Sequence, residues 1–516
     1  MKNRYLFTII ISILAISCIK DDTVNSFKKL NEVTITGLEN SYSFNLFEEV
    51  EIKPVITTSE KNESNLDFRW YMYNTNHRFA ADTISKEKNL KVVMGGTPGL
   101  PYTLVFKVID KLTGVYYSKT MSAQVFGALT KGTMFLCEED GVVDVNFMKP
   151  DSTITRGIYK SANPGETLGS NPLGIFFINP NASKPLIMKH VYITTNSANG
   201  GAIVDPITFK RVKWLRDNFY VLPTYPNLKP TLYFKGSLAD YFFINGKLFN
   251  RAANMADPLW KPELLITALD QPREYDLADL LIFPTGSPII FDNKYGRFLQ
   301  HNPENKGELF AFVGGSKAAF DYNNSGLKMH FCAQTTLPVG SIGRYGFAIT
   351  EDPKTGKRYM LKYLLGRRNP DVLFSVYADE KREITSAGYP GLFAATTYAS
   401  DFATMQGVLW YASGGKLYSL NSFDAQPVEV LQKDFTSQGI VIDLIKFFTY
   451  TVLDPLTGKN VSVTELRLAV RNNTLTTKKA GMIYMRGNTV GGVNITETGR
   501  KFGIADRIFA FDEKLN

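Results

Sequence analysis

The stretch DYFFINGKLFN, residues 240–250, contains a pattern that recurs along most of this chain. An apolar run ends at an Asn-Gly pair, and a second run begins with Lys-Leu directly after it. The stretch GVLWYASGGKLYSLN, residues 407–421, repeats the pattern with a Gly-Gly pair. Such pairs favour the tight turns that join antiparallel strands. Each stretch therefore predicts a β-hairpin.

Hairpin patterns of this kind recur along most of the chain. One turn glycine marks each unit, and the markers follow one another at intervals of 46 to 66 residues: Gly141, Gly200, Gly246, Gly296, Gly356, Gly415 and Gly481. Repeated strand–turn–strand units of about this length are typical of propeller blades. The seven units predict a seven-bladed β-propeller over residues 128–516. We expect the run FGIADRIFAFD, residues 502–512, to close the ring by pairing with the first blade.

Residues 30–127 show a different rhythm of short, often alternating apolar runs between turn residues. Seven such runs predict a β-sandwich, with Trp70 in its core. A Pro98-Gly99 pair leads into the strand that begins at Tyr102 and ends at Asp110. This layout resembles PKD-like immunoglobulin-type domains, in which a Trp-bearing strand precedes a Gly-x-Tyr turn. One extra residue separates Gly99 from Tyr102. The whole chain is therefore predicted to be all-β.

Composition excludes some classes of function. The chain has 516 residues, of which 44% are hydrophobic and 13% aromatic, so it is not a disordered protein. Its net charge is +9. The positive residues are scattered, whereas nucleic-acid binding needs a clustered basic stripe. We therefore expect no nucleic-acid partner.

The N-terminal stretch MKNRYLFTIIISILAISC has the layout of a bacterial lipoprotein signal. A short basic start precedes an apolar run that is too short to span a bilayer and reads as a removable segment. Cleavage of residues 1–17 would leave Cys18 as the lipidated N-terminus of a tether over residues 18–29. Lys20, Asp21 and Asp22 follow Cys18 and resemble the surface-export signal of Bacteroidota lipoproteins. These residues predict a lipid anchor in the outer membrane, facing the extracellular side.

A lipoprotein signal, a PKD-like domain and a propeller together resemble the PKD-like family lipoproteins of Bacteroidota. Such proteins accompany SusC-like TonB-dependent transporters and SusD-like lipoproteins in nutrient uptake. The resemblance implies these two partners, and an oligosaccharide or peptide as the ligand. It implies a non-catalytic accessory or binding role.

Catalytic and metal-binding patterns are not recognisable in the sequence. GxSxG, HExxH, CxxC and EF-hand patterns do not occur. We therefore expect no enzyme activity, no catalytic residue, no metal and no cofactor. A propeller hydrolase or lyase that acts on polysaccharide or peptide is the alternative, because propeller enzymes can use dispersed carboxylates. Two carboxylates about 5–10 Å apart in the middle of the ring would favour a glycosidase. A structural adhesin is a third reading.

The acids Glu138, Glu139, Asp140 and Asp144 cluster around the first turn and could bind calcium or form a solvated hairpin tip. Cys137 and Cys332 each lie in a β-like run, and the sequence leaves open whether they pair.

Two tryptophans are the candidate ligand-binding residues. Trp214 lies among basic residues in KRVKWLRDNFY, and Trp260 lies in the Pro-flanked stretch DPLWKPELL. Both interrupt the strand rhythm, where propellers present binding loops. Indole faces stack on sugar rings and hold cations or peptide side chains. Trp410 lies on a strand and is predicted to be core.

Overall fold

The computed structural model contains two compact units, Met1–Ala128 and Leu129–Asn516. It describes residues 30–514 except for 46–48, 61, 76–81, 95–97, 99, 128, 130, 179–188, 221–223, 236–238, 253–260, 263, 266–273, 284–287, 303–307, 313, 340–342, 368–373, 401–406, 454–459 and 489–493.

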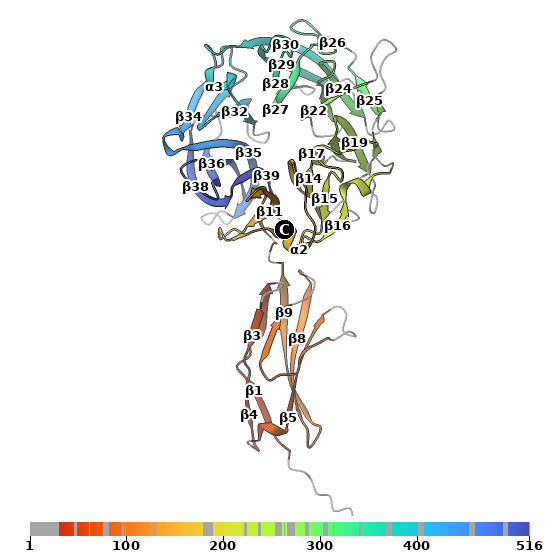
Figure 1. Cartoon of the computed structure of the whole chain (residues 1–516), viewed down its shortest axis with the longest axis vertical. Coiled ribbons are helices and arrows are strands. Elements are labelled where there is room, and N and C mark those ends of the chain that lie inside the picture. The colour runs from red at the N-terminus through yellow and green to blue at the C-terminus, as the bar shows by residue number, and fades with distance from the viewer. Residues whose placement is uncertain are drawn as a thin grey trace, which may run out of the picture. The chain divides into compact units, whose positions relative to one another are not determined.

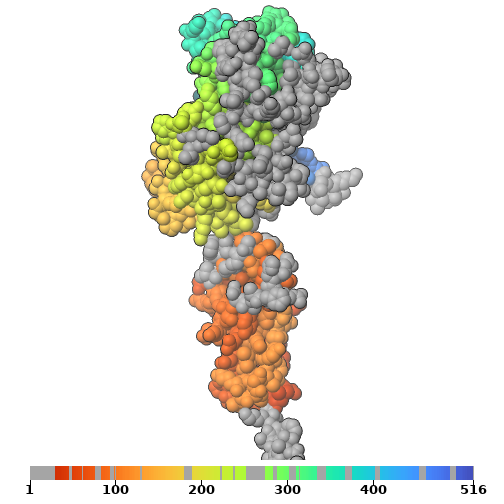
Figure 2. All heavy atoms as spheres, turned by 90° about the vertical axis from the view of Figure 1, so that its right-hand side faces the viewer, coloured from red at the N-terminus to blue at the C-terminus, as the bar shows by residue number. Residues whose placement is uncertain are grey.

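The first unit is a β-sandwich whose atoms form a compact, elongated body (Figure 2). A five-stranded sheet with the order β2-β9-β8-β5-β6 is accompanied by the two-stranded sheets β1-β4 and β3-β7. The strands are β1 Val33–Thr36, β2 Ser41–Asn45, β3 Glu49–Ile52, β4 Val55–Thr58, β5 Leu66–Asn74, β6 Asp82–Ser85, β7 Leu90–Val93, β8 Pro101–Asp110 and β9 Tyr116–Phe126, with the 3-10 turn η1 Glu63–Asn65 before β5.

The core of this unit is formed by the side chains that alternate inward along its strands. Every second residue of β8 from Leu104 to Val108 is buried, as period-two side-chain direction requires. Trp70 is fully buried, and its ring centroid lies 4.5 Å from that of Phe106. The apolar run VEIKPVIT, residues 50–57, belongs to two strands, because Pro54 lies between β3 and β4 and cannot donate to a ladder. The strand β6 was not predicted.

The second unit is a ring of seven sheets, which confirms the predicted seven-bladed propeller (Figure 1). Strands β39, β17, β22, β27 and β35 lie toward the middle of the ring. From the inner strand outward, blade 1 contains β39 Arg507–Lys514, β10 Gly132–Glu139, β11 Val142–Met148 and β12 Ile154–Thr155; blade 2 contains β13 Pro172–Ile178, β14 His190–Thr195, β15 Gly201–Val204 and β16 Arg211–Trp214; blade 3 contains β17 Pro230–Lys235, β18 Ala239–Ile244, β19 Lys247–Ala252 and β20 Lys261–Pro262.

The remaining blades follow the same order. Blade 4 contains β22 Leu277–Phe283, β23 Ile289–Asp292, β24 Arg297–Asn302, β25 Glu308–Ala311 and the outer β21 Leu264–Leu265; blade 5 contains β27 Lys328–Val339, β28 Gly343–Glu351, β29 Arg358–Arg367, β30 Phe374–Ile384 and the outer β26 Gly315–Ser316; blade 6 contains β31 Thr397–Ala399, β32 Val408–Ser413, β33 Lys416–Asn421 and β34 Val430–Asp434; blade 7 contains β35 Ile440–Leu453, β36 Asn460–Asn472, β37 Ala480–Asn488 and β38 Asn494–Ala505.

In the described part of the chain, helices are short and lie in the connections between strands. They are α2 Ile158–Ala162, η2 Leu215–Asn218, α3 Pro390–Phe393 and η3 Thr436–Gln438. In the described part of the chain, no helix has the length and apolar character to cross a membrane.

Ring closure uses the C-terminal strand, as predicted. β39 pairs antiparallel with β10 of blade 1. Asp512 then ties β39 to both neighbouring blades, since it accepts a hydrogen bond from the Phe177 amide at 2.9 Å and lies 3.3 Å from Nζ of Lys446. The buried Lys514 donates to the carbonyl oxygens of Leu129 and Pro206.

Apolar clusters fill the junctions between blades. At the junction of blades 4 and 5, Phe298 packs edge-on against Tyr363 at a centroid distance of 5.0 Å, and both are fully buried. Trp410 of blade 6 lies in the cluster shared with blade 7 and is also fully buried. Burying large side chains of this kind stabilises each junction by about 1.5–3 kcal/mol per side chain.

The marker glycines occupy the central hairpin of each blade, except in blade 7. There Gly481 lies inside β37, and the turn between β36 and β37 contains no glycine. Asn472 shapes that turn by accepting hydrogen bonds from the amide and hydroxyl of Thr474, and Lys478 adopts a left-handed φ of 47°. This turn therefore combines asparagine hydrogen bonds with a lysine at positive φ, where most other blades have a glycine at positive φ.

Candidate functional site

Blade 7 forks at one end into two ribbons. β35 and β36 pair along their whole lengths, but β36 pairs with β37 only over Leu466–Arg471. Beyond that point, residues 449–453 pair only with 460–464, and residues 486–488 pair with 494–496. The third ladder thus ends early and exposes the side chains at the base of the fork.

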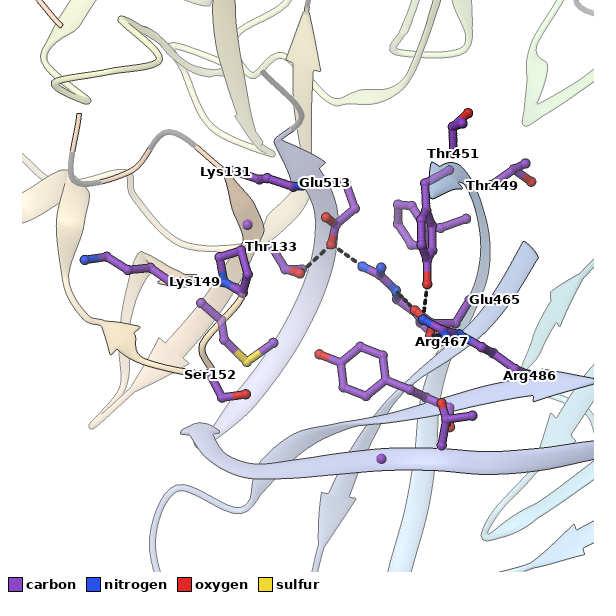
Figure 3. A pocket seen from close by; sticks show the side chains of 18 residues that line it. Lys131, Thr133, Lys149, Ser152, Thr449, Thr451, Glu465, Arg467, Arg486 and Glu513 are labelled. Carbon is purple, nitrogen blue, oxygen red and sulfur yellow. Dashed lines mark hydrogen bonds and ion pairs between the residues drawn. The ribbon is translucent and has the colours of Figure 1, made fainter. Parts of the chain in front are cut away.

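A pocket of about 830 Å³ lies at this fork, between blade 7 and blade 1 (Figure 3). Its walls come from all four strands of blade 7, from the start of β10, the end of β11 and the segments next to them, and from β39. Its lining is rich in hydroxyl and charged groups and comprises Lys131, Gly132, Thr133, Met148, Lys149, Pro150, Ser152, Phe448, Thr449, Tyr450, Thr451, Glu465, Arg467, Tyr484, Arg486, Thr498, Gly499 and Glu513.

Arg467 is the centre of an ion-pair network in this pocket. Its Nε donates to Oε2 of Glu465 at 2.8 Å, and its Nη1 donates to Oε1 of Glu513. Glu513 also accepts a hydrogen bond from the hydroxyl of Thr133, so the network joins blade 7 to blade 1 (Figure 3). The side chains of Glu465 and Arg467 are 4% and 10% exposed. Burial acts to lower the pKa of Arg467, but the carboxylates of Glu513 and Glu465 outweigh it and raise that pKa.

Arg486 bridges the two ribbons of the fork. Its Nε donates to Oε1 of Glu465 at 2.9 Å, and its Nη2 donates to the hydroxyl of Tyr450. The side chain of Arg486 is 46% exposed, which places it at the mouth of the pocket rather than at its base. Glu465 thereby holds one guanidinium on each of its two oxygens.

Two phenols complete the lining. Burial raises the pKa of Tyr484 to about 12, against the opposing effect of Arg467. Burial and the nearby Glu465 also raise the pKa of Tyr450. Both phenols therefore keep their protons at neutral pH and can donate hydrogen bonds. The guanidinium of Arg467 lies over the rings of Phe448 and Tyr484, at 4.6 and 5.5 Å from their centroids.

A second pocket of about 340 Å³ lies among the inner strands of blades 4 to 7. Its lining is mainly apolar and includes Leu281, Phe331, Tyr398 and Phe447. Lys446 is the charged residue among the described side chains that line it, and no carboxylate lines it.

The candidate Trp214 lies outside both pockets. It ends β16, the outer strand of blade 2, rather than standing in an insertion. One face of its ring is covered by the guanidinium of Arg211 at 4.3 Å from the centroid. Arg211 in turn makes two hydrogen bonds of 2.7 Å to the carboxylate of Glu166. Trp214 therefore takes part in a local stack on this blade.

Several other predicted site residues lie outside the described part of the chain. They are Cys18, Lys20, Asp21, Asp22 and Trp260.

The acidic cluster of blade 1 has structural partners. Asp144 accepts hydrogen bonds from the amides of Val145 and Tyr159 and so holds the start of α2, while Glu139 pairs with Arg156 at 2.7 Å. Within the described residues, no group of three or more His, Cys, Asp or Glu side chains could hold a metal ion.

Cys137 and Cys332 are buried free thiols in blades 1 and 5. Burial raises the pKa of both thiols.

Sequence reasoning missed the pocket residues of blade 7. A usable signal was present in VTELRLAV, residues 463–470, where Glu465 and Arg467 interrupt an apolar strand at a spacing of two. That spacing places both side chains on one face of the strand.

Comparison with known proteins finds a family match over part of the chain. The model of the PKD-like family matches residues 18–172. This confirms the expected PKD-like character of the N-terminal part and extends the match into blade 1 and the helix that follows it. No curated protein sequence matches the chain.

Two solved structures from Bacteroides thetaiotaomicron are similar to this chain at low identity. A quinonprotein alcohol dehydrogenase-like protein shares 12% identity with a TM-score of 0.36, covering 90% of this chain and 96% of that protein. The extracellular domain of a proposed one component system shares 10% identity with a TM-score of 0.36 and covers 85% of this chain. This chain spans 52% of the length of that domain.

Proposed function

We propose that this protein is a lipid-anchored outer-membrane protein on the cell surface that binds an oligosaccharide as a non-catalytic component of a nutrient-uptake system. The pocket between blades 7 and 1 is the observation that carries the proposal. The signal around Cys18 and the PKD-like match of residues 18–172 support the anchored location and the family context. A SusC-like transporter and a SusD-like lipoprotein are the proposed partners.

The composition of the pocket favours a sugar over an apolar ligand or a plain peptide. Hydroxyl groups come from Thr133, Ser152, Thr449, Tyr450, Thr451, Tyr484 and Thr498. Hydroxyl groups, phenols and charged side chains can donate and accept along a ring of sugar hydroxyls. A volume of about 830 Å³ falls in the range of small-molecule sites. A peptide remains the other ligand to test.

A hydrolase or lyase is the second candidate function, because Glu465 and Glu513 line the same pocket. Glycosidic cleavage needs two carboxylates on either side of the scissile bond. Here Arg467 bonds to both carboxylates and occupies the space between them. The inner pocket is lined by no carboxylate among the described residues. These arrangements support binding without cleavage. Product analysis after incubation with polysaccharides and peptides tests this, and released fragments would contradict the non-catalytic proposal.

Gly499 offers a direct test of the pocket. A Cβ atom at this position would meet no heavy atom closer than 4.0 Å, so a larger side chain enters the pocket without strain. We expect Gly499→Leu to bind oligosaccharides from an array at least tenfold more weakly than the natural protein. Ser118→Leu adds similar bulk on β9 of the first unit and should bind normally. Unchanged array binding by Gly499→Leu would place the binding site elsewhere.

The proposed partners need a separate experiment. The tagged, lipidated protein is purified from outer membranes in mild detergent, and co-purifying proteins are identified by mass spectrometry. Near-stoichiometric recovery of a SusC-like transporter and a SusD-like lipoprotein supports the uptake role. Recovery of the protein alone contradicts that role without affecting the pocket test.

A further inference from the structure

We propose that the saccharide bound between blades 7 and 1 is acidic, and that its carboxylate or sulfate group contacts Arg486, Arg467 and Lys131. This inference rests on the proposed saccharide-binding function and adds the charge class of the ligand. It follows from the hydrogen-bonding groups of the pocket that take no part in the ion-pair network around Arg467.

The donors left over are cationic. Arg467 uses Nε and Nη1 within the network, and among the described residues no acceptor bonds to its Nη2. Arg486 uses Nε and Nη2, and its Nη1 likewise has no acceptor in the described part of the chain. Lys131 is exposed, its side chain runs toward Glu513, and it forms no ion pair with a carboxylate in the described part of the chain (Figure 3). Three cationic side chains with unused donors therefore line this pocket.

The anionic acceptors are almost all used. Both oxygens of Glu465 accept from guanidinium groups, and Oε1 of Glu513 accepts from Arg467 and Thr133. Among the carboxylate oxygens of this pocket, only Oε2 of Glu513 accepts no hydrogen bond from the described residues. The hydroxyl groups of the pocket can donate and accept and so serve the neutral hydroxyls of a sugar, whereas the unused guanidinium and ammonium groups can only donate. These cationic donors match a ligand that also carries anionic oxygens.

The charge balance points the same way. Arg467, Arg486 and Lys131 face two carboxylates, and Lys149 adds a fourth cation at the rim, although its side chain extends away from the network (Figure 3). Tyr450 and Tyr484 keep their protons and add no negative charge. Guanidinium groups recognise carboxylate and sulfate by paired, charge-assisted hydrogen bonds, which are stronger than bonds between neutral groups.

Matched pairs of glycans test the charge without changing the sugar. Titration calorimetry compares oligogalacturonates with their methyl esters, and sulfated carrageenan oligosaccharides with their desulfated forms. An array of paired acidic and neutral glycans widens the search. We expect at least one acidic glycan to bind tenfold or more tightly than its neutral partner, and its affinity to fall between about 0.05 and about 0.5 M salt. The acid that binds distinguishes carboxylate from sulfate.

Variants connect this preference to the pocket. Arg486→Gln should reduce the affinity for the acidic glycan about tenfold more than the affinity for its neutral partner, because only the acidic glycan loses a charge–charge contact. Lys131→Gln should act in the same direction. Lys354→Gln, in the turn between β28 and β29, is the control and should bind normally.

The outcomes separate the two proposals. Equal binding of acidic and neutral partners, or preference for neutral glycans, overturns the acidic-ligand inference and leaves saccharide binding intact. Absence of binding to every glycan overturns the saccharide-binding function, and the inference with it. A tenfold preference that survives Arg486→Gln and Lys131→Gln together would show that other residues recognise the acid, and would overturn the assignment.

Discussion

The junction between blades 4 and 5 and the junction between blades 7 and 1 are built differently. The first is held by fully buried rings such as Phe298 and Tyr363. The second also has an apolar cluster, but one end of it opens into a pocket and is held by Arg467 between two glutamates. A junction that opens into a pocket has less apolar surface to pack at that end. There the ion pairs of Arg467 with Glu465 and Glu513 join blade 7 to blade 1.

Loss of the closing strand β39 should reduce the stability of the ring more than any other change. Deletion of residues 507–516 removes β39, its ladder with β10 and the contacts of Asp512 and Lys514. We expect the ring to lose its cooperative thermal unfolding and to be cleaved rapidly by proteases. Deletion of residues 515–516 alone keeps β39 and is the control. A cooperative transition in the longer deletion would show that the ring closes without this strand.

The apolar junction should be the more sensitive to a single truncation. Phe298→Ala removes a fully buried ring and leaves a cavity beside Tyr363. We expect the free energy of unfolding to fall by about 3–5 kcal/mol in urea titrations. Binding to the pocket of blades 7 and 1 should not change while the variant is folded. A loss below about 1 kcal/mol would mean that this junction repacks around the gap.

A single substitution in the charged junction between blades 7 and 1 should cause a smaller loss of stability. Arg467→Met preserves most of the volume but leaves Glu513 without its guanidinium and Glu465 with Arg486 alone. We expect a loss of about 3 kcal/mol, at the lower end for a broken buried ion pair because the pocket admits water. Urea titrations measure it. A more stable variant would show that the network serves the pocket at the expense of stability.

The pH dependence of stability should give the smallest effect, at most about 1.4 kcal/mol for each pH unit. Burial lowers the pKa of Lys514 to about 8. An exposed lysine has a pKa of about 10.4, so the unfolded chain holds the proton more tightly. Between these values the unfolded state binds more protons, and stability therefore rises with pH through that window. The cost of the buried charge is fully present below it.

The variant Lys514→Met removes this titration. The free energy of unfolding is measured for the natural protein and for the variant at pH values below, within and above this window. As the pH rises, the natural protein should gain stability relative to the variant. A constant difference would contradict a lowered pKa for Lys514.

Local pattern was enough to predict the fold. Period-two alternation and turn glycines such as Gly246 and Gly415 identify hairpins, and the count of hairpins gives the blades. The pattern failed where other side chains shape a turn, as Asn472 does in blade 7, and where a proline splits a strand, as Pro54 does.

The candidate site was harder to predict because long-range pairing builds it. Arg467 meets Glu513 at a separation of 46 residues, and Thr133 meets the same carboxylate at a separation of 380. No local spacing brings these residues together. Trp214 attracted attention as an aromatic residue among basic ones, but Arg211 already covers one of its faces. The spacing of Glu465 and Arg467 within an apolar strand was the one local signal.

The separation of 380 residues between Thr133 and Glu513 also has a consequence for biosynthesis. A ribosome adds about 5–20 residues per second, so β10 waits roughly 20–80 seconds for the strand that completes its blade. During that interval its edge presents unpaired backbone groups to other chains. A chain that is interrupted before β39 is made should therefore be prone to aggregate through this edge.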